Sequence, residues 1–170
     1  YKEYYDNGQL KEDSTYNNDK RDGPYTSFYK NGQLKEGSTY KNGELDGTSK
    51  SYYENGQLEY EGTVKNGKID GPYISYYDNG QLESEGTNNN GNGQVKWYDE
   101  NGQLESEKTY EYGKMISEKK FDYYKNGQLK LEKNYKYGEL HGLFKWYHDN
   151  GQIYRERIYK YGELIDSKEY

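Results

Sequence analysis

The sequence predicts an all-β fold, an elongated single-sheet array of seven tandem β-hairpin repeats that is twisted or trough-shaped. Three observations predict it. A tight-turn motif recurs at a nearly constant interval, and a second turn signal lies between its copies. The segments between turns are short, rich in Tyr and Thr, and poor in helix formers. Short strands separated by regular turn signals are typical of antiparallel hairpins.

The first turn motif is Asn-Gly-Gln-Leu, with Ile in place of Leu in its last copy. Its seven copies follow one another by 24, 24, 24, 22, 25 and 24 residues, and they begin at Asn7, Asn31, Asn55, Asn79, Asn101, Asn126 and Asn150. A period of about 20–50 residues marks a repeat array. The repeats are placed at about 2–23, 24–47, 48–71, 72–93, 94–117, 118–142 and 143–166, with a short tail at 167–170.

Each first turn has an aromatic residue three positions before its asparagine and an aliphatic residue three positions after it, such as Tyr52 and Leu58. A three-residue loop with a left-handed glycine would place this pair directly opposite on two strands. A two-residue Asn-Gly loop would instead oppose the leucine with Tyr53, a position that holds Asp99 and His148 in two other copies. The uninterrupted aromatic–aliphatic pair therefore predicts the three-residue loop.

The second turn lies ten to twelve residues further on, as in "KNGELDG" at 41–47. Because side chains alternate between faces along a strand, Leu34, Ser38 and Tyr40 are expected on one inner face. The small residues of this face leave room for neighbouring rings, and Thr39 and its equivalents face solvent. One segment, "NNNGNG" at 88–93, is two residues short, and we expect a soft point or a bend there.

Composition limits the possible classes. Aliphatic residues are few, but 25 tyrosines can bury apolar rings while keeping their hydroxyls wet. The absence of cysteine excludes disulfides and thiolate metal sites, and no apolar run is long enough for a membrane helix. Net charge is −6 overall, −6 over 72–113 and +3 over 114–170. This balance disfavours nucleic acid or an anionic membrane as the partner.

Candidate catalytic groups are sparse, so we expect no enzyme, no cofactor and no metal site. His141 and His148 stand at positions that hold other residue types in other repeats. Acidic pairs such as Glu83 and Glu85 would lie on an open sheet, without a pocket that could shift their pKa. No calcium-binding loop motif is present.

The alternating motifs Tyr-Tyr-x-Asn-Gly-x-Leu and Lys-Asn-Gly-x-x-x-Gly resemble MORN repeats, in the bacterial variant form often described as an antitoxin family. The segment "EGTVKNGKIDGPYISYYDNGQLESEG" at 61–86 matches that form best, and the resemblance covers about 2–166. It implies antiparallel hairpins used in scaffolding, self-association or partner binding. The last repeats depart from the pattern, because Tyr112, Tyr137 and Tyr161 replace the asparagine of the second turn and Trp97 and Trp146 replace a tyrosine.

We therefore expect a non-enzymatic scaffold that binds a protein partner or forms a homo-oligomer. One alternative is a secreted or surface adhesin-like module that binds glycan, and another is an antitoxin or immunity protein. The candidate contact residues are aromatic: Tyr5, Tyr29, Tyr53, Tyr77, Tyr124, Trp97 and Trp146. Under the three-residue loop the five tyrosines form a row on the polar face, whereas an error in register would make them core residues.

The two ends of the array differ in composition. The first strand, at 1–5, shows no cap, whereas the last strand has the charged Lys168 and Glu169, which suit an exposed edge. We expect the first edge to be covered by further repeats or by a second copy. The chain opens at Tyr1 rather than methionine, so we expect it to be a piece of a longer protein. The sequence leaves the cellular location undecided, and we favour a secreted or cell-surface location.

Overall fold

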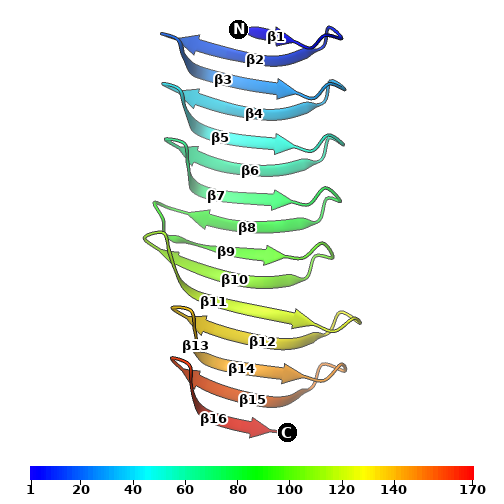
Figure 1. The fold of residues 1–170 in the computed structure, drawn as a ribbon, viewed down its shortest axis with the longest axis vertical. Helices are drawn as coiled ribbons and strands as arrows, with labels where there is room; N and C mark the ends of the chain where they lie inside the picture. The colour runs from blue at the N-terminus through cyan, green and yellow to red at the C-terminus, as the bar shows by residue number, and fades with distance from the viewer. The chain divides into compact units, whose positions relative to one another are not determined.

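The computed structural model describes residues 1–170 and contains sixteen strands and no helix. The chain divides into two compact units, Tyr1–Asn89 and Asn90–Tyr170, so the division falls within the irregular "NNNGNG" segment. Each unit is a run of antiparallel hairpins (Figure 1). The predicted all-β fold of tandem hairpins is confirmed. No helix long and apolar enough to cross a membrane occurs in the chain.

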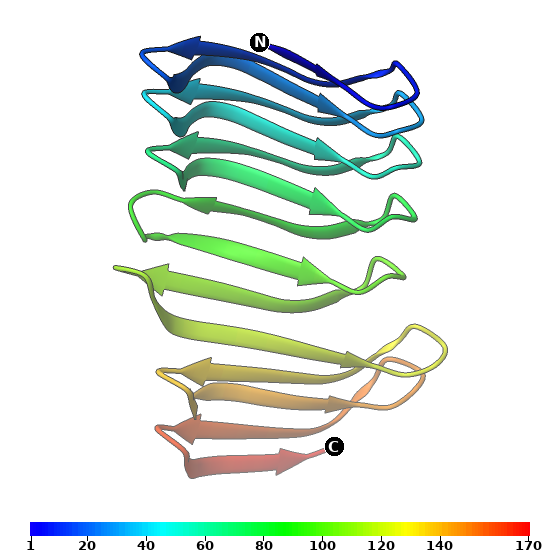
Figure 2. The same ribbon diagram turned by 45° about the horizontal axis from the view of Figure 1, so that its top comes forward.

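The first unit is an open antiparallel sheet in which each strand pairs with its neighbours in the sequence. Its strands are β1 (Lys2–Tyr4), β2 (Leu10–Asn17), β3 (Lys20–Phe28), β4 (Leu34–Lys41), β5 (Glu44–Tyr52), β6 (Leu58–Lys65), β7 (Lys68–Tyr76) and β8 (Leu82–Asn88). The first turns lie along one edge of this sheet and the second turns along the other (Figure 2). The sheet order follows the chain because every connection is a hairpin.

The second unit is built in the same way, with one interruption. Its strands are β9 (Gly93–Tyr98), β10 (Leu104–Glu111), β11 (Lys114–Tyr123), β12 (Leu129–Lys136), β13 (Glu139–Leu140), β14 (Gly142–Tyr147), β15 (Ile153–Lys160) and β16 (Glu163–Glu169). Both β13 and β14 pair with β12, so they are two parts of one strand position, separated at His141. The side-chain amide of Asn134 in β12 donates to the carbonyl of Leu143 at this break.

The first turn is the three-residue loop that the sequence predicts. The N–H of Tyr29 donates to the carbonyl of Gln33 at 2.8 Å, and the N–H of Gly32 donates to the carbonyl of Tyr29 at 2.9 Å. Gly32 has a φ of 87°, in the left-handed region. The seven aromatic–aliphatic pairs are confirmed as direct cross-strand partners: Tyr4–Leu10, Phe28–Leu34, Tyr52–Leu58, Tyr76–Leu82, Tyr98–Leu104, Tyr123–Leu129 and Tyr147–Ile153.

A β-bulge follows each of these pairs and reverses which side-chain positions of the strand lie on which face of the sheet. Phe28 stands opposite Leu34, but Ser27 stands opposite Glu36, so one strand carries an extra residue. Since Ser27 and Phe28 are consecutive, they point to opposite faces, and therefore Leu34 and Glu36 do so too. The prediction that Leu34 shares a face with Ser38 is wrong. Strict alternation along the strand, on which it relied, does not hold across a bulge.

The buried face of the first unit is a single layer of rings over small residues. Tyr25 stands between Ser14 and Ser38 on its two neighbouring strands, and all three side chains are buried. The Tyr25 ring packs edge-on against Tyr40, with centroids 5.5 Å apart. Thr39, on the other face, is exposed. The predicted role of the small residues, to leave room for rings, is confirmed.

Candidate functional site

Five of the seven first turns are preceded by a tyrosine directly after the strand end, and this connecting tyrosine joins successive repeats. Its hydroxyl donates to a main-chain carbonyl of the next repeat at 2.7 Å. The four pairs are Tyr5 with Phe28, Tyr29 with Tyr52, Tyr53 with Tyr76 and Tyr124 with Tyr147. Tyr77 occupies the same loop position, and its N–H donates to the carbonyl of Gln81. All five rings are half-buried, so this row of candidate contact residues lies between repeats, with part of each ring exposed.

The asparagine of the first turn adds a second connection. The Asn31 side-chain oxygen accepts from the N–H of Gln33 at 2.9 Å, and its amide donates to the carbonyl of Glu54, in the next repeat, at 3.2 Å. Asn7, Asn55 and Asn126 do the same. In these four first turns, the same side chain therefore sets the conformation of the turn and the spacing to the next repeat.

Asp99 replaces the connecting tyrosine in one repeat. Its carboxylate accepts from the N–H groups of Asn101 and Gln103 at 2.9 and 2.8 Å, which closes its own turn. Two other bonds link it to the next repeat: the Gln103 amide donates to the carbonyl of Gly127 at 3.2 Å, and the Tyr123 hydroxyl donates to the carbonyl of Leu104 at 2.8 Å. This repeat therefore keeps its turn but lacks the bond from the connecting tyrosine position.

The two tryptophans lie on one face of the second unit, separated by β10, β11 and β12. The Trp97 ring is partly exposed, with the Lys108 ammonium 5.9 Å from its centroid. The Trp146 ring is half-buried and stacks on Phe144, with centroids 4.0 Å apart. The two rings do not meet in one site.

The second turns are two-residue loops in which both residues have positive φ. In the first unit the leading residue is asparagine, as in Asn42 at 53° and Asn66 at 49°. Asn90 at the boundary of the units is another such asparagine, with a φ of 53°. In the three later turns it is tyrosine, and Tyr112, Tyr137 and Tyr161 have φ values of 49°, 52° and 49°. Asparagine tolerates this region well, whereas for a bulky residue it is an outlier. The fold therefore gives no reason for tyrosine here.

These three tyrosines are also highly accessible. Their exposed fractions are 87% for Tyr112, 63% for Tyr137 and 49% for Tyr161. We call Tyr112, Tyr137 and Tyr161 the tyrosine edge. The sequence shows the replacement of asparagine, but neither the strain nor the exposure that it causes.

Main-chain hydrogen bonds hold the turns of the tyrosine edge in place. The N–H of Gly113 donates to the carbonyl of Gly91 at 2.8 Å, and the N–H of Gly162 donates to that of Leu140 at 2.9 Å. The N–H of Tyr137 donates to the carbonyl of Ile116 at 2.9 Å. The exposed rings are therefore carried on backbone that is fixed to the preceding repeat.

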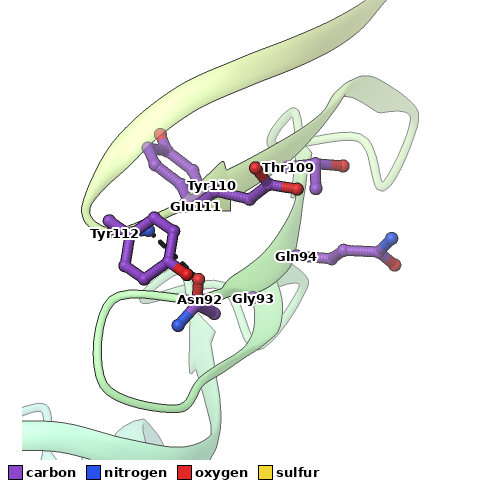
Figure 3. Close-up of a pocket in the computed structure, with 7 residues that line it drawn as sticks. All are labelled: Asn92, Gly93, Gln94, Thr109, Tyr110, Glu111 and Tyr112. Carbon is purple, nitrogen blue, oxygen red and sulfur yellow. Dashed lines mark hydrogen bonds between the residues drawn. The ribbon is translucent and has the colours of Figure 1, made fainter.

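A shallow hollow of about 470 Å³ adjoins the first of these tyrosines (Figure 3). Its lining includes Asn92, Gln94, Tyr110 and Tyr112. The N–H of Tyr112 donates to the side-chain oxygen of Asn92 at 3.1 Å. The hollow thus offers amide groups and two rings at the start of the tyrosine edge.

The histidines lie in different repeats. The His141 ring packs on Tyr161 with centroids 4.7 Å apart, and the His148 ring packs on Tyr154 at the same separation. No group of three His, Cys, Asp or Glu side chains is placed to hold a metal ion. Glu83 and Glu85 lie on β8 of the open sheet.

Burial and the neighbouring Glu132 carboxylate raise the pKa of Tyr147 to about 12. Its hydroxyl donates to Glu132 at 3.2 Å. An unfolded tyrosine ionises near pH 10, so the unfolded chain loses this proton first. The stability that Tyr147 contributes should be complete below about pH 10 and disappear as pH rises through about 12. Urea denaturation at a series of pH values checks this, and Tyr147→Phe should weaken the alkaline loss. An unchanged loss in this variant would contradict it.

Comparison with known families agrees with this architecture. The family described as MORN repeat variant matches the chain seven times, at 1–18, 21–42, 45–66, 69–90, 91–112, 113–137 and 140–161. Among curated proteins, none matches the chain significantly. MORN repeats are a non-catalytic repeat type that indicates a scaffold, commonly for protein or membrane interaction. With seven matched hairpin repeats along nearly its whole length, the chain belongs to the MORN repeat variant family.

Proposed function

We propose that this chain is a non-enzymatic scaffold that binds a protein partner through the tyrosine edge. The observation that carries the proposal is that exposed tyrosines occupy strained turn positions in three successive repeats. Backbone strain that the fold does not require is concentrated at functional sites. The Tyr161 ring packs on His141 and the Lys136 ammonium lies 5.6 Å from the Tyr137 ring centroid, but about half or more of each edge tyrosine stays exposed in the free chain. The benefit of that exposed surface has to come from a contact with another molecule.

The surroundings of the tyrosine edge favour a protein over other partners. Tyrosine is enriched at protein interfaces, because its ring is apolar and its hydroxyl forms hydrogen bonds. The flanking charges are mixed, with Glu111 and Lys114 around the first turn and Lys160 and Glu163 around the last. A nucleic acid or an anionic membrane would select a run of cations instead.

The geometry also suits an extended contact. Each repeat contributes two strands spaced about 4.8 Å apart, so successive turns on one edge recur roughly every 10 Å. Because the turns are fixed by main-chain hydrogen bonds, little order is lost when a partner binds. A partner surface or segment that follows the edge can therefore meet one ring per repeat.

The test compares the chain with a Tyr112→Asn, Tyr137→Asn, Tyr161→Asn triple variant. Asparagine is the residue that the first unit uses at this turn position, so the triple variant should fold and gain stability. Each immobilised form is incubated with isotope-labelled extract of the source cell, and captured proteins are quantified. The triple variant should lose a captured protein by at least about tenfold, as expected for hot-spot aromatics. The purified protein should then show the same loss in a direct affinity measurement.

Two control variants test whether the loss of capture is specific to the tyrosine edge. Tyr170→Asn removes a similarly exposed tyrosine outside the turns and should leave capture unchanged. A Trp97→Phe, Trp146→Phe variant tests the glycan alternative, which depends on the tryptophans. Capture that survives in the triple variant but fails in the tryptophan variant would overturn the proposal.

A further inference from the structure

A half-buried arginine on the sheet face of the second unit lacks an acidic partner. Arg157 in β15 stands opposite Phe144 on β14 and Ser167 on β16. Its guanidinium carbon lies 5.4 Å from the centroid of the Trp146 ring. One terminal nitrogen reaches the hydroxyl of Tyr159 at 3.5 Å, and the Nε atom is buried without a hydrogen-bond partner. The charge is thus held against aromatic rings and is not neutralised.

The other cations on this face all have carboxylates. Lys108 and Lys120 lie 3.6 and 3.4 Å from Glu118. The two remaining pairs are Lys133 with Asp122 at 3.1 Å and Arg155 with Glu169 at 2.7 Å. The strand registers place these cations on the same face as Arg157. Every other cation on this face is therefore paired with a carboxylate, and Arg157 is the exception.

The first unit contains the same arrangement with the carboxylate present. The guanidinium carbon of Arg21 lies 4.5 Å from the centroid of Tyr25, and its Nε atom is likewise buried without a partner. A terminal nitrogen of Arg21, however, contacts the Glu12 carboxylate at 2.8 Å. In the first unit, then, an arginine held over an aromatic ring has its charge neutralised by a glutamate carboxylate.

We propose that Arg157, together with Trp146 and Tyr159, is a binding site for a glutamate or aspartate carboxylate on another protein. The planar donors of arginine match the two oxygens of a carboxylate, and the Trp146 ring fixes the guanidinium from one side. The rings around it suit an apolar side chain next to the acid. Nucleic acid or a polyanionic glycan would need several unpaired cations, whereas Arg157 alone is unpaired here.

This site is separate from the tyrosine edge and does not rest on the function proposed for that edge. Failure of either proposal leaves the other intact, because the turn variants change neither Arg157 nor its neighbours. The two experiments also use different probes.

The test uses the fluorescence of Trp146 in a Trp97→Phe background, where it is the only tryptophan. The probe is a hexapeptide of alternating Glu and Leu, and its control has Gln in place of Glu. We expect a saturable response to the Glu peptide, at least about tenfold weaker for the Gln peptide and for Arg157→Gln. Equal responses to the two peptides would overturn the proposal. Tighter binding of inorganic phosphate or heparin would overturn the choice of a carboxylate.

A second variant tests the site without removing the arginine. Ser167→Glu places a carboxylate directly opposite Arg157, within reach of a cross-strand pair. This variant should show a higher thermal midpoint than the matched Ser167→Gln variant and should no longer bind the Glu peptide. Full peptide binding by Ser167→Glu, with no gain in midpoint, would contradict the proposal even if Arg157→Gln does not fold.

Discussion

Alanine in place of Tyr25 is expected to lower the free energy of unfolding by about 3–5 kcal/mol, as for other buried aromatics. Tyr25 is only 9% exposed, and its ring covers Ser14 and Ser38 on the adjacent strands. The change also removes the edge contact with Tyr40 and the ring beneath Arg21. Urea denaturation followed by circular dichroism measures the loss.

The matched control is Tyr112→Ala, which removes the ring of the most exposed tyrosine of the tyrosine edge. Its side chain contributes no buried contact in the free chain, so the change should stay within about 0.5 kcal/mol. If both variants lost similar amounts of stability, the single buried layer of rings would not be the core of the first unit.

Alanine in place of Gly62 is expected to cost about 1–3 kcal/mol through overpacking. A Cβ atom at Gly62 would lie 2.1 Å from the hydroxyl oxygen of Tyr60 and 2.6 Å from the ring carbon that carries it. The Tyr60 ring lies over this glycine on the same strand and cannot bend away as a flexible chain would. The denaturation midpoint of the variant should fall accordingly.

Gly37→Ala is the control for this prediction, because nothing lies within 4 Å of a Cβ atom there. It should be neutral or slightly stabilising, since alanine restricts the unfolded chain. In a Tyr60→Ala background the ring is absent, so the further change Gly62→Ala should lower the free energy of unfolding by less than it does in the natural sequence. A Gly62→Ala variant as stable as Gly37→Ala would show that the ring does not occupy this position.

The turn chemistry of this chain could be predicted from sequence. Asn-Gly turns strongly indicate hairpins, and the aromatic–aliphatic pair such as Phe28 and Leu34 selects one loop length because it has no exceptions. Repetition strengthens the prediction, because comparing seven copies of one pattern separates the positions that stay the same from the positions that vary. The register at each first turn follows directly.

The faces of the sheet could not be predicted in the same way. The bulge that separates Leu34 from Glu36 leaves no mark in the alternation of residue types. The bonds from Tyr29 and Asn31 run to the next repeat, so no spacing within one hairpin reveals them. The unpaired state of Arg157 depends on which residues stand across from it on two other strands. These features follow from pairing between segments, not from local pattern.

The connecting tyrosines hold the repeats together, while the tyrosine edge is free for contact with a partner. Nitration with tetranitromethane, read at each tyrosine by mass spectrometry, tests it most directly. In the purified chain Tyr112, Tyr137 and Tyr161 should react first, and Tyr29 and Tyr53, which are half-buried and hydrogen-bonded, should react slowly. With the captured partner bound, the edge tyrosines should become protected. Rapid nitration of Tyr29 and Tyr53 would show that the connecting tyrosines do not hold the repeats together, and no protection of the edge by the partner would show that the edge is not the contact surface.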